Sequence, residues 1–159
     1  MIRDLSITAE TVGCGLEFRP KAFLEISNAS VPLKKPNGGL WSSPVGSEWS
    51  WTDWCRSEEF LSEDKLRQRF TFEFSGRCVV IDSVKDLSDL AWIEARVSPA
   101  FTNRGIDFQG MLACGIDAIW LTAEGEEVTR FSKPRDLYGW DCETVLVMNP
   151  KCIQTEIAA

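Results

Sequence analysis

Short runs of apolar and β-branched residues, several of them followed by Pro, Asn or Ser, recur along the chain and predict β-strands. The clearest is residues 143–148, where the apolar run stops at Asn149 and Pro150. The β-branched run at 78–81 is similarly compact. The pattern predicts strands over residues 21–27, 40–43, 65–74, 78–81, 117–122 and 143–148.

Other segments have apolar residues at helical spacing. Ser50 is a residue type that caps helices, and it precedes two tryptophans spaced to share a helical face. Helices are predicted over residues 50–60, 83–93 and 107–114, and a turn over 123–126. Many short strands with few helices indicate a compact α+β domain rather than a regular alternation of strands and helices.

Length and composition indicate one globular unit. A chain of 159 residues with 44% apolar and 26% charged residues fits a single domain, here residues 1–159. No run approaches the roughly 18 apolar residues of a membrane helix. The first residues lack the basic and apolar regions of a signal peptide, so we expect a soluble, cytoplasmic protein. The six cysteines lack the short paired spacing of a zinc site, and we expect no metal and no disulfides.

Charge and the absence of histidine narrow the chemistry. The net charge of −7 disfavours binding along an extended stretch of nucleic-acid backbone, so any nucleic-acid contact would be local. Without histidine the chain lacks the commonest general base, the commonest metal ligand and the Ser-His and Cys-His pairs. An enzyme with this sequence must use carboxylates, hydroxyls, aromatic rings, Arg or Lys.

Two acids stand at the start of the last predicted strand. Asp141 and Glu143 are two residues apart, a spacing that gives side chains in a strand the same face. Paired acids at the edge of a strand are a candidate catalytic site. Taken alone, the pair favours a solvated strand start, because acids are usually exposed.

Tryptophans are concentrated in one stretch. Trp41, Trp49, Trp51 and Trp54 are four of the seven in the chain, and they follow the glycine pair Gly38–Gly39. Indoles supply large buried area, so some of them belong to the core. A flat ring beside small hydroxyls and a glycine loop also suits stacking on a planar heterocycle.

The order of these segments resembles a group of small, mostly uncharacterised bacterial and phage proteins that look like mono-ADP-ribosyltransferases. The resemblance spans roughly residues 20–155, and its most distinctive parts are Gly-Gly-Leu-Trp at 38–41 and Gly-Trp-Asp-Cys-Glu at 139–143. It implies two small, mostly antiparallel sheets around a cleft, with a few short helices, in an ADP-ribosyltransferase-like fold. It also implies NAD as the substrate that is split.

The resemblance implies roles for particular residues. Glu143 matches the catalytic glutamate, and Asp141 matches the residue two positions earlier that often helps to choose the acceptor. The family's first motif usually begins with His or Arg, whereas Glu25 stands near that place here. Arg56 and Lys35 are alternative cations for the pyrophosphate. The expected cofactor-binding residues are Ser27, Lys35, Gly39, Trp41, Ser42, Ser43 and Trp54.

The expected function is therefore an NAD-dependent mono-ADP-ribosyltransferase or NAD glycohydrolase, with a protein, nucleic acid, small molecule or water as acceptor. The alternative is a non-catalytic phage or host-defence binding module that uses the tryptophan-rich groove. A glycosidase is a weaker interpretation, because carboxylates two apart on one strand would lie side by side, about 6 to 7 Å apart, and not on opposite sides of a sugar.

Overall fold

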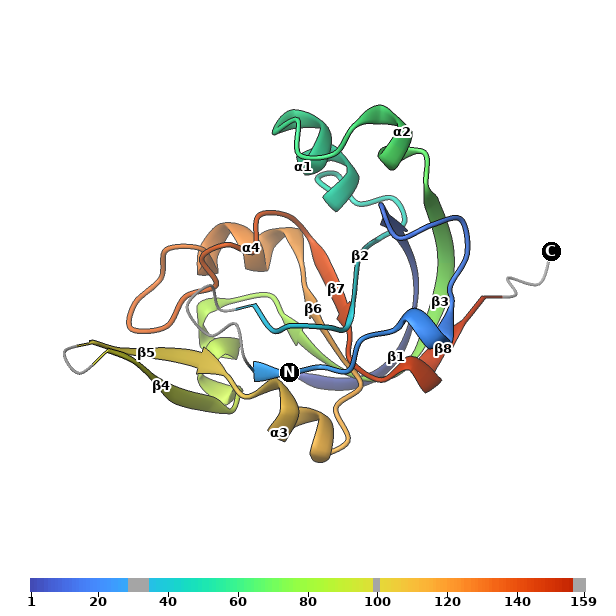
Figure 1. Cartoon of the computed structure of the whole chain (residues 1–159). Helices are drawn as coiled ribbons and strands as arrows, with labels where there is room; N and C mark the ends of the chain where they lie inside the picture. The colour runs from blue at the N-terminus through green and yellow to red at the C-terminus, as the bar shows by residue number, and fades with distance from the viewer. Residues whose placement is uncertain (29–34, 99–100, 156–159) are drawn as a thin grey trace.

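The computed structural model describes residues 1–28, 35–98 and 101–155, which form a mixed α+β fold built on a closed β-barrel (Figure 1). The main sheet has the order β1-β2-β7-β6-β3-β8, and the additional pairing of β1 with β3 closes five of its strands into a barrel. The pairings are antiparallel except that of β3 with β6. The strands of this sheet are β1 Ile2–Val12, β2 Leu40–Pro44, β3 Arg69–Ile81, β6 Ala118–Leu121, β7 Thr144–Val147 and β8 Ile153–Gln154.

A separate two-stranded hairpin and several short helices surround the barrel. The hairpin consists of β4 Trp92–Ser98 and β5 Phe101–Ile106, and it extends to one side of the barrel in Figure 1. The α-helices are α1 Trp51–Ser57, α2 Glu63–Leu66, α3 Phe108–Ala113 and α4 Ala123–Thr129. The short 3-10 helices of the described residues are η1 Pro20–Ala22, η3 Val84–Asp89 and η4 Pro150–Cys152.

The alternation of side chains along the strands produces two packed layers. One alternate set fills the barrel interior, where Phe72 and Phe74 of β3 meet Val145 of β7. The other set points outward, and Ile119 of β6 and Leu146 of β7 pack there against α3, η3 and Trp140. Both faces of the central strands are therefore buried, which explains their continuous apolar runs.

Helices α1 and α2 form a segment above one end of the barrel (Figure 1). A reciprocal capping box begins α1: Ser50 Oγ accepts from the Asp53 amide, and the Asp53 carboxylate accepts from the Ser50 amide. The helix packs through Cys55 against Val12 of β1. This segment and the barrel wall bound the candidate site.

The sequence-based expectations for several elements are confirmed. The strand at 40–43 is β2, the helix at 50–60 contains α1, the helix at 107–114 is α3, and the strands at 117–122 and 143–148 contain β6 and β7.

Other expectations are wrong. The segment at 21–27 is not a strand: it begins in η1, and Ser27 takes part in an isolated β-bridge to Asn37. The expected helix at 83–93 is a shorter 3-10 helix, η3, and β4 begins before residue 93, while the turn at 123–126 is helix α4. The main sheet closes on itself, so the two sheets do not flank a common cleft as expected.

We expect Gly125→Ala to lower the free energy of unfolding. Gly125 lies in α4, and an added Cβ would collide with the backbone carbonyl oxygen of Ile81 at the end of β3. Alanine favours a helix by about 1 kcal/mol over glycine. We expect the collision to outweigh this gain and to leave a net loss of about 1–2 kcal/mol. Urea unfolding measures the change.

The control for this prediction is Glu124→Ala, an exposed position on the same helix. It adds the alanine preference without a collision, so its effect should be close to zero. A Gly125→Ala protein as stable as the wild type would mean that α4 moves freely away from β3.

Candidate functional site

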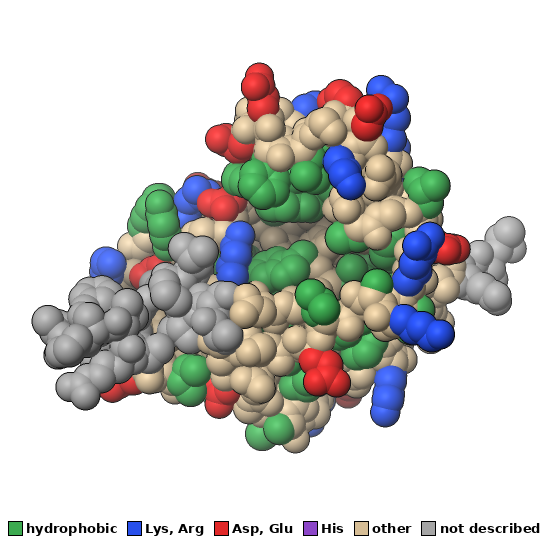
Figure 2. Space-filling model, viewed as in Figure 1, with side chains coloured by type: hydrophobic (Ala, Val, Ile, Leu, Met, Phe, Trp, Pro, Cys, Tyr) green, Lys and Arg blue, Asp and Glu red, His purple; other side chains and the backbone are tan. Residues whose placement is uncertain are grey.

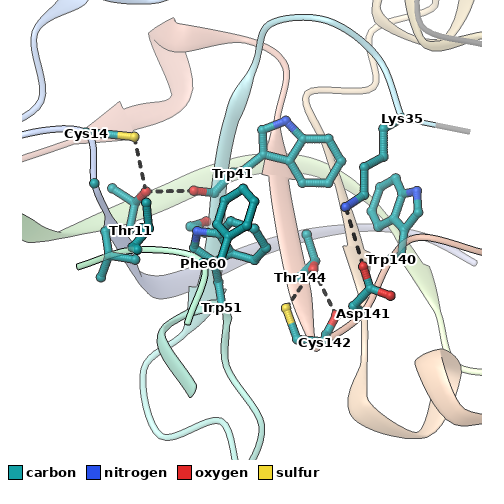
Figure 3. Close-up of a pocket in the computed structure, with 14 residues that line it drawn as sticks. Thr11, Cys14, Lys35, Trp41, Trp51, Phe60, Trp140, Asp141, Cys142 and Thr144 are labelled. Carbon is teal, nitrogen blue, oxygen red and sulfur yellow. Dashed lines mark hydrogen bonds and ion pairs between the residues drawn. The ribbon is translucent and has the colours of Figure 1, made fainter. Parts of the chain in front are cut away.

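A cavity of about 350 Å³ lies between the barrel wall and the α1–α2 segment. In Figure 2 it is a hollow with hydrophobic side chains above and below it and a basic side chain at one edge. Figure 3 shows the lining residues. They are Thr11, Val12, Gly13, Cys14, Lys35, Trp41, Ser42, Trp51, Phe60, Leu61, Trp140, Asp141, Cys142 and Thr144.

Aromatic rings form most of the walls. Trp41 of β2 and Trp140, which precedes β7, are tilted against each other with ring centroids 5.0 Å apart. Trp140 is 1% exposed and is backed by Phe108, whose ring is parallel to it. On the opposite wall, Trp51 stacks on Trp54 at 4.9 Å. The rings are therefore held by a second layer of aromatic side chains.

One ammonium group lies between the two aromatic walls. Lys35 Nζ is 5.4 Å from the centroid of the Trp41 ring and 5.9 Å from that of Trp51, within the range of cation–π attraction. It also lies 3.9 Å from Asp141 Oδ2 (Figure 3). Burial lowers the pKa of Lys35 despite the nearby Asp141 carboxylate. The cavity thus combines indole faces with a carboxylate, the chemistry that binds organic cations.

The Asp141 carboxylate is fixed from a second side by Arg130. Arg130 Nη2 donates to Asp141 Oδ1 at 2.8 Å, while Nη1 donates to Glu126 Oε1 at 2.9 Å. Trp49 Nε1 donates to the Asp141 carbonyl oxygen at 3.0 Å. The helix α4 therefore positions the acid of the cavity through Arg130.

Glu143 has different surroundings from Asp141. Its Oε1 accepts from Trp120 Nε1 at 3.0 Å, and it does not line the cavity. Strand β7 begins only at Thr144, so the spacing of two residues does not bring both carboxylates into the cavity. Glu143 lies beside the site through its main chain, because its carbonyl oxygen accepts from Ser43 Oγ at 2.7 Å.

The hydroxyl groups of β2 serve mainly to tie strands together. Ser42 Oγ donates to the Val145 carbonyl oxygen at 2.7 Å, and Ser43 Oγ accepts from the Trp51 amide at 2.8 Å. Thr11 Oγ1 donates to the Trp41 carbonyl oxygen at 2.7 Å. These bonds hold Trp41 and Trp51 in place on the two sides of the cavity.

The remaining predicted site residues lie outside the cavity lining. Ser27 pairs with Asn37, and Trp54 supports Trp51 from behind. Gly39 has a φ of +72°, and an added Cβ would crowd Ile26 and Leu146. Arg56 is an exposed residue of α1, 3.6 Å from Glu63. The cavity therefore brings together four of the predicted residues, namely Lys35, Trp41, Ser42 and Asp141.

Comparisons with protein-family models, with curated proteins and with solved structures found no match. Within the described ranges, no helix has the length and apolar character of a membrane span. The same part of the chain contains no cluster of three or more acidic or cysteine side chains that could hold a metal ion. The geometry of the cavity is therefore the basis for interpreting the site.

Several residues of the site were not selected from the sequence. Trp51 belongs to the tryptophan-rich stretch and Trp140 to the segment at 139–143. Their position in the cavity wall depends on packing between elements that are distant in the sequence. Arg130 carries no local signal, because its importance comes from reaching Asp141. Cys142 also lines the cavity as a free thiol, and burial raises its pKa to about 11. It is therefore protonated and a poor nucleophile at neutral pH.

Proposed function

We propose that this chain binds NAD through its nicotinamide end and cleaves the bond between nicotinamide and ribose, as a mono-ADP-ribosyltransferase or an NAD glycohydrolase. The observation that carries the proposal is the ammonium of Lys35 between Trp41 and Trp51, beside the carboxylate of Asp141. The nicotinamide ring of NAD is a planar cation. Indole faces with one carboxylate suit such a ring.

The size of the cavity suits one end of NAD. A volume of about 350 Å³ is at the lower end of the usual range for ligand pockets, about 300–1,000 Å³. It accommodates a nicotinamide ring and part of the ribose, with the rest of the dinucleotide extending from the open side. Val12, Phe60 and Leu61 add apolar surface beside the rings.

The carboxylates supply the chemistry for cleavage. As the bond breaks, its electron pair passes to the ring nitrogen and positive charge develops on the ribose. A carboxylate beside the ribose stabilises this transition state more than the ground state. We assign this role to Glu143, whose side chain must turn from Trp120 Nε1 into the cavity to reach the ribose. Asp141 holds the cationic ring, or acts as general base: the nucleophilic atom of the acceptor adds to the ribose carbon and its proton passes to the Asp141 carboxylate.

The pairing of strands supports a divergent ADP-ribosyltransferase-like fold. Strands β2 and β7 are neighbours, with Trp41 opposite Leu146 and Ser42 opposite Val145. The segment at 41–43 therefore lies beside β7, and Ser43 Oγ donates to the Glu143 carbonyl oxygen just before that strand, so the segments matched to the second and third motifs are adjacent. The third segment, near Ser27, is linked to this region by the bond from the Gly39 amide to the Leu24 carbonyl oxygen.

A non-catalytic module that binds an organic cation is the second candidate. The observation that favours it is the bond from Trp120 Nε1 to Glu143 Oε1, which directs this carboxylate toward β6. In this case the cavity would retain its ligand unchanged. The acceptor of the first candidate is a protein, a nucleic acid or a small molecule, and the net charge of −7 argues against a long phosphate backbone.

Incubation of the protein with NAD and a cell lysate tests the proposal. We expect release of nicotinamide and transfer of labelled ADP-ribose or its hydrolysis. Trp41→Ala removes one ring of the cavity and should weaken NAD binding by at least about tenfold, the size of one good ring contact. Trp92→Ala is the matched control, because Trp92 lies in the hairpin outside the cavity lining.

The outcomes separate the two candidates. Release of nicotinamide by the wild type and by Trp92→Ala, with a loss in Trp41→Ala, supports cleavage in this cavity. NAD binding without release favours the binding module. The absence of both binding and release would contradict an NAD site.

A further inference from the structure

The side chain of Lys35 occupies the position that an external cation would take in the cavity. Its ammonium lies over the rings of Trp41 and Trp51. It is also paired with Asp141, as Figure 3 shows. The side chain is 29% exposed, so the group is partly withdrawn from water. These are the contacts that an aromatic cage offers to any bound cation. Two cations cannot occupy this position together.

Lys35 is the more loosely held of the two cations beside Asp141. Arg130 is fixed at 2.8 Å from Asp141 and is also bonded to Glu126. The ammonium of Lys35 is 3.9 Å from the carboxylate, at the outer limit of a direct ion pair. Its four-carbon stem is flexible, and the ammonium is strongly hydrated when it is free. Lys35 can therefore leave the cage while Arg130 keeps Asp141 in position.

We propose that Lys35 is an internal competitor that a flat organic cation must displace from the cage. The identification of that cation as the nicotinamide ring of NAD rests on the proposed function, but the displacement itself requires no cleavage. The inference defines the ligand class of the cavity as planar and positively charged. It also gives Lys35 a regulatory role, because in the free protein its ammonium holds the position between Trp41, Trp51 and Asp141.

The return of Lys35 to its position between Trp41 and Trp51 would also assist the release of nicotinamide. When the bond to ribose breaks, its electron pair neutralises the ring nitrogen and nicotinamide becomes uncharged. A neutral ring makes a weaker contact with the indoles and with Asp141 than a cation does. The ammonium of Lys35 can then return to the cage and expel it. The cationic ring thus replaces Lys35 at the start of the cycle, and Lys35 replaces the neutral ring at its end.

Two ligands of almost the same shape test the inference without any turnover. 1-Methylnicotinamide carries the permanent positive charge of the ring in NAD, whereas nicotinamide is neutral. Their binding is measured by quenching of tryptophan fluorescence and by calorimetry, for the wild type and for Lys35→Met and Lys35→Gln. Lys35→Arg keeps the charge, and Lys21→Met is the control at an exposed lysine. Thermal unfolding shows that each variant is folded.

We expect Lys35→Met and Lys35→Gln to bind 1-methylnicotinamide about tenfold more tightly than the wild type, equivalent to about 1.4 kcal/mol. Binding of nicotinamide should change by less than about threefold. Lys35→Arg and Lys21→Met should resemble the wild type. An equal gain for both ligands would show that Lys35 only fills space, and would overturn the inference. So would no gain for the cation, or no binding of either ligand to any variant.

This experiment is independent of NAD cleavage. A gain in affinity for the cation in a protein that never releases nicotinamide from NAD supports the inference and contradicts the catalytic proposal. If the protein cleaves NAD and the removal of Lys35 leaves the affinity for 1-methylnicotinamide unchanged, the catalytic proposal is supported and the inference is contradicted.

Discussion

Replacement of Glu143 by Gln is expected to lower the rate of nicotinamide release by about 10²–10³, the usual cost of removing one group that stabilises transition-state charge. Glutamine has nearly the same shape, and its Oε1 can still accept from Trp120 Nε1. The fold and the affinity for NAD should therefore change little. The rate is measured at saturating NAD, and the affinity is measured separately by fluorescence quenching.

The control for this prediction is Glu127→Gln, which removes an exposed carboxylate from α4 and should leave the rate unchanged. Asp141→Asn provides the informative contrast, because Asp141 is the acid that lines the cavity. Full turnover in Glu143→Gln combined with loss in Asp141→Asn would transfer the catalytic role to Asp141. The side-chain bond from Trp120 would then be purely structural.

The elements that could be predicted from the sequence are those with strong local signals. Ser50 and Asp107 cap the helices α1 and α3 through side-chain bonds to backbone amides a few residues away. Strands β6 and β7 are compact apolar runs with clear ends. These signals depend on neighbours in the sequence and need no tertiary contact.

The closure of the barrel depends on contacts between distant residues. Strand β1 alternates Leu5, Ile7 and Ala9 inward, and it pairs with β3 from Ile2↔Val79 to Val12↔Arg69. No strand was predicted over residues 2–12, because the alternation there is short and the choice of partner strand has no local signal. Conversely, the apolar residues Phe23 and Ile26 led to the prediction of a strand at 21–27. In the structure they are apolar because both pack against the core from an irregular segment.

The error at residues 123–126 has a similar cause. Gly125 indicates a turn when it is considered alone, since glycine is disfavoured inside helices. In the structure, it allows α4 to approach the carbonyl oxygen of Ile81, and Thr122 caps the helix. The requirement for glycine therefore arises from the close approach of two elements rather than from the local backbone.

The candidate site was predicted in part for the same reason. Asp141 and Trp41 were selected because their segments are unusual in composition, and both line the cavity. The choice between Asp141 and Glu143 as the acid of the cavity depends on where β7 begins and on Arg130, thirteen residues before Glu143. The position of the Lys35 ammonium depends on its approach to Trp51, which is sixteen residues away in the sequence. Such relations become visible only in three dimensions.

Replacement of Trp140 by Ala is expected to lower the free energy of unfolding by about 3–5 kcal/mol, the usual cost of removing a large buried aromatic side chain. Trp140 is 1% exposed and contacts the rings of Trp41 and Phe108. Its loss opens a void between the outer layer of the barrel and the cavity. The same substitution removes one wall of the candidate site, so binding of NAD should also be lost.

Urea unfolding followed by circular dichroism measures the effect, with Trp49→Ala as the matched control. Trp49 is 40% exposed and donates one hydrogen bond to the Asp141 carbonyl oxygen, so its removal should cost about 1 kcal/mol. Equal losses for the two variants would mean that the packing around Trp140 contributes no more than a surface contact. A large loss confined to Trp140→Ala would instead show that the wall of the cavity is part of the core of the fold, because the same indole packs against Phe108 and against Trp41.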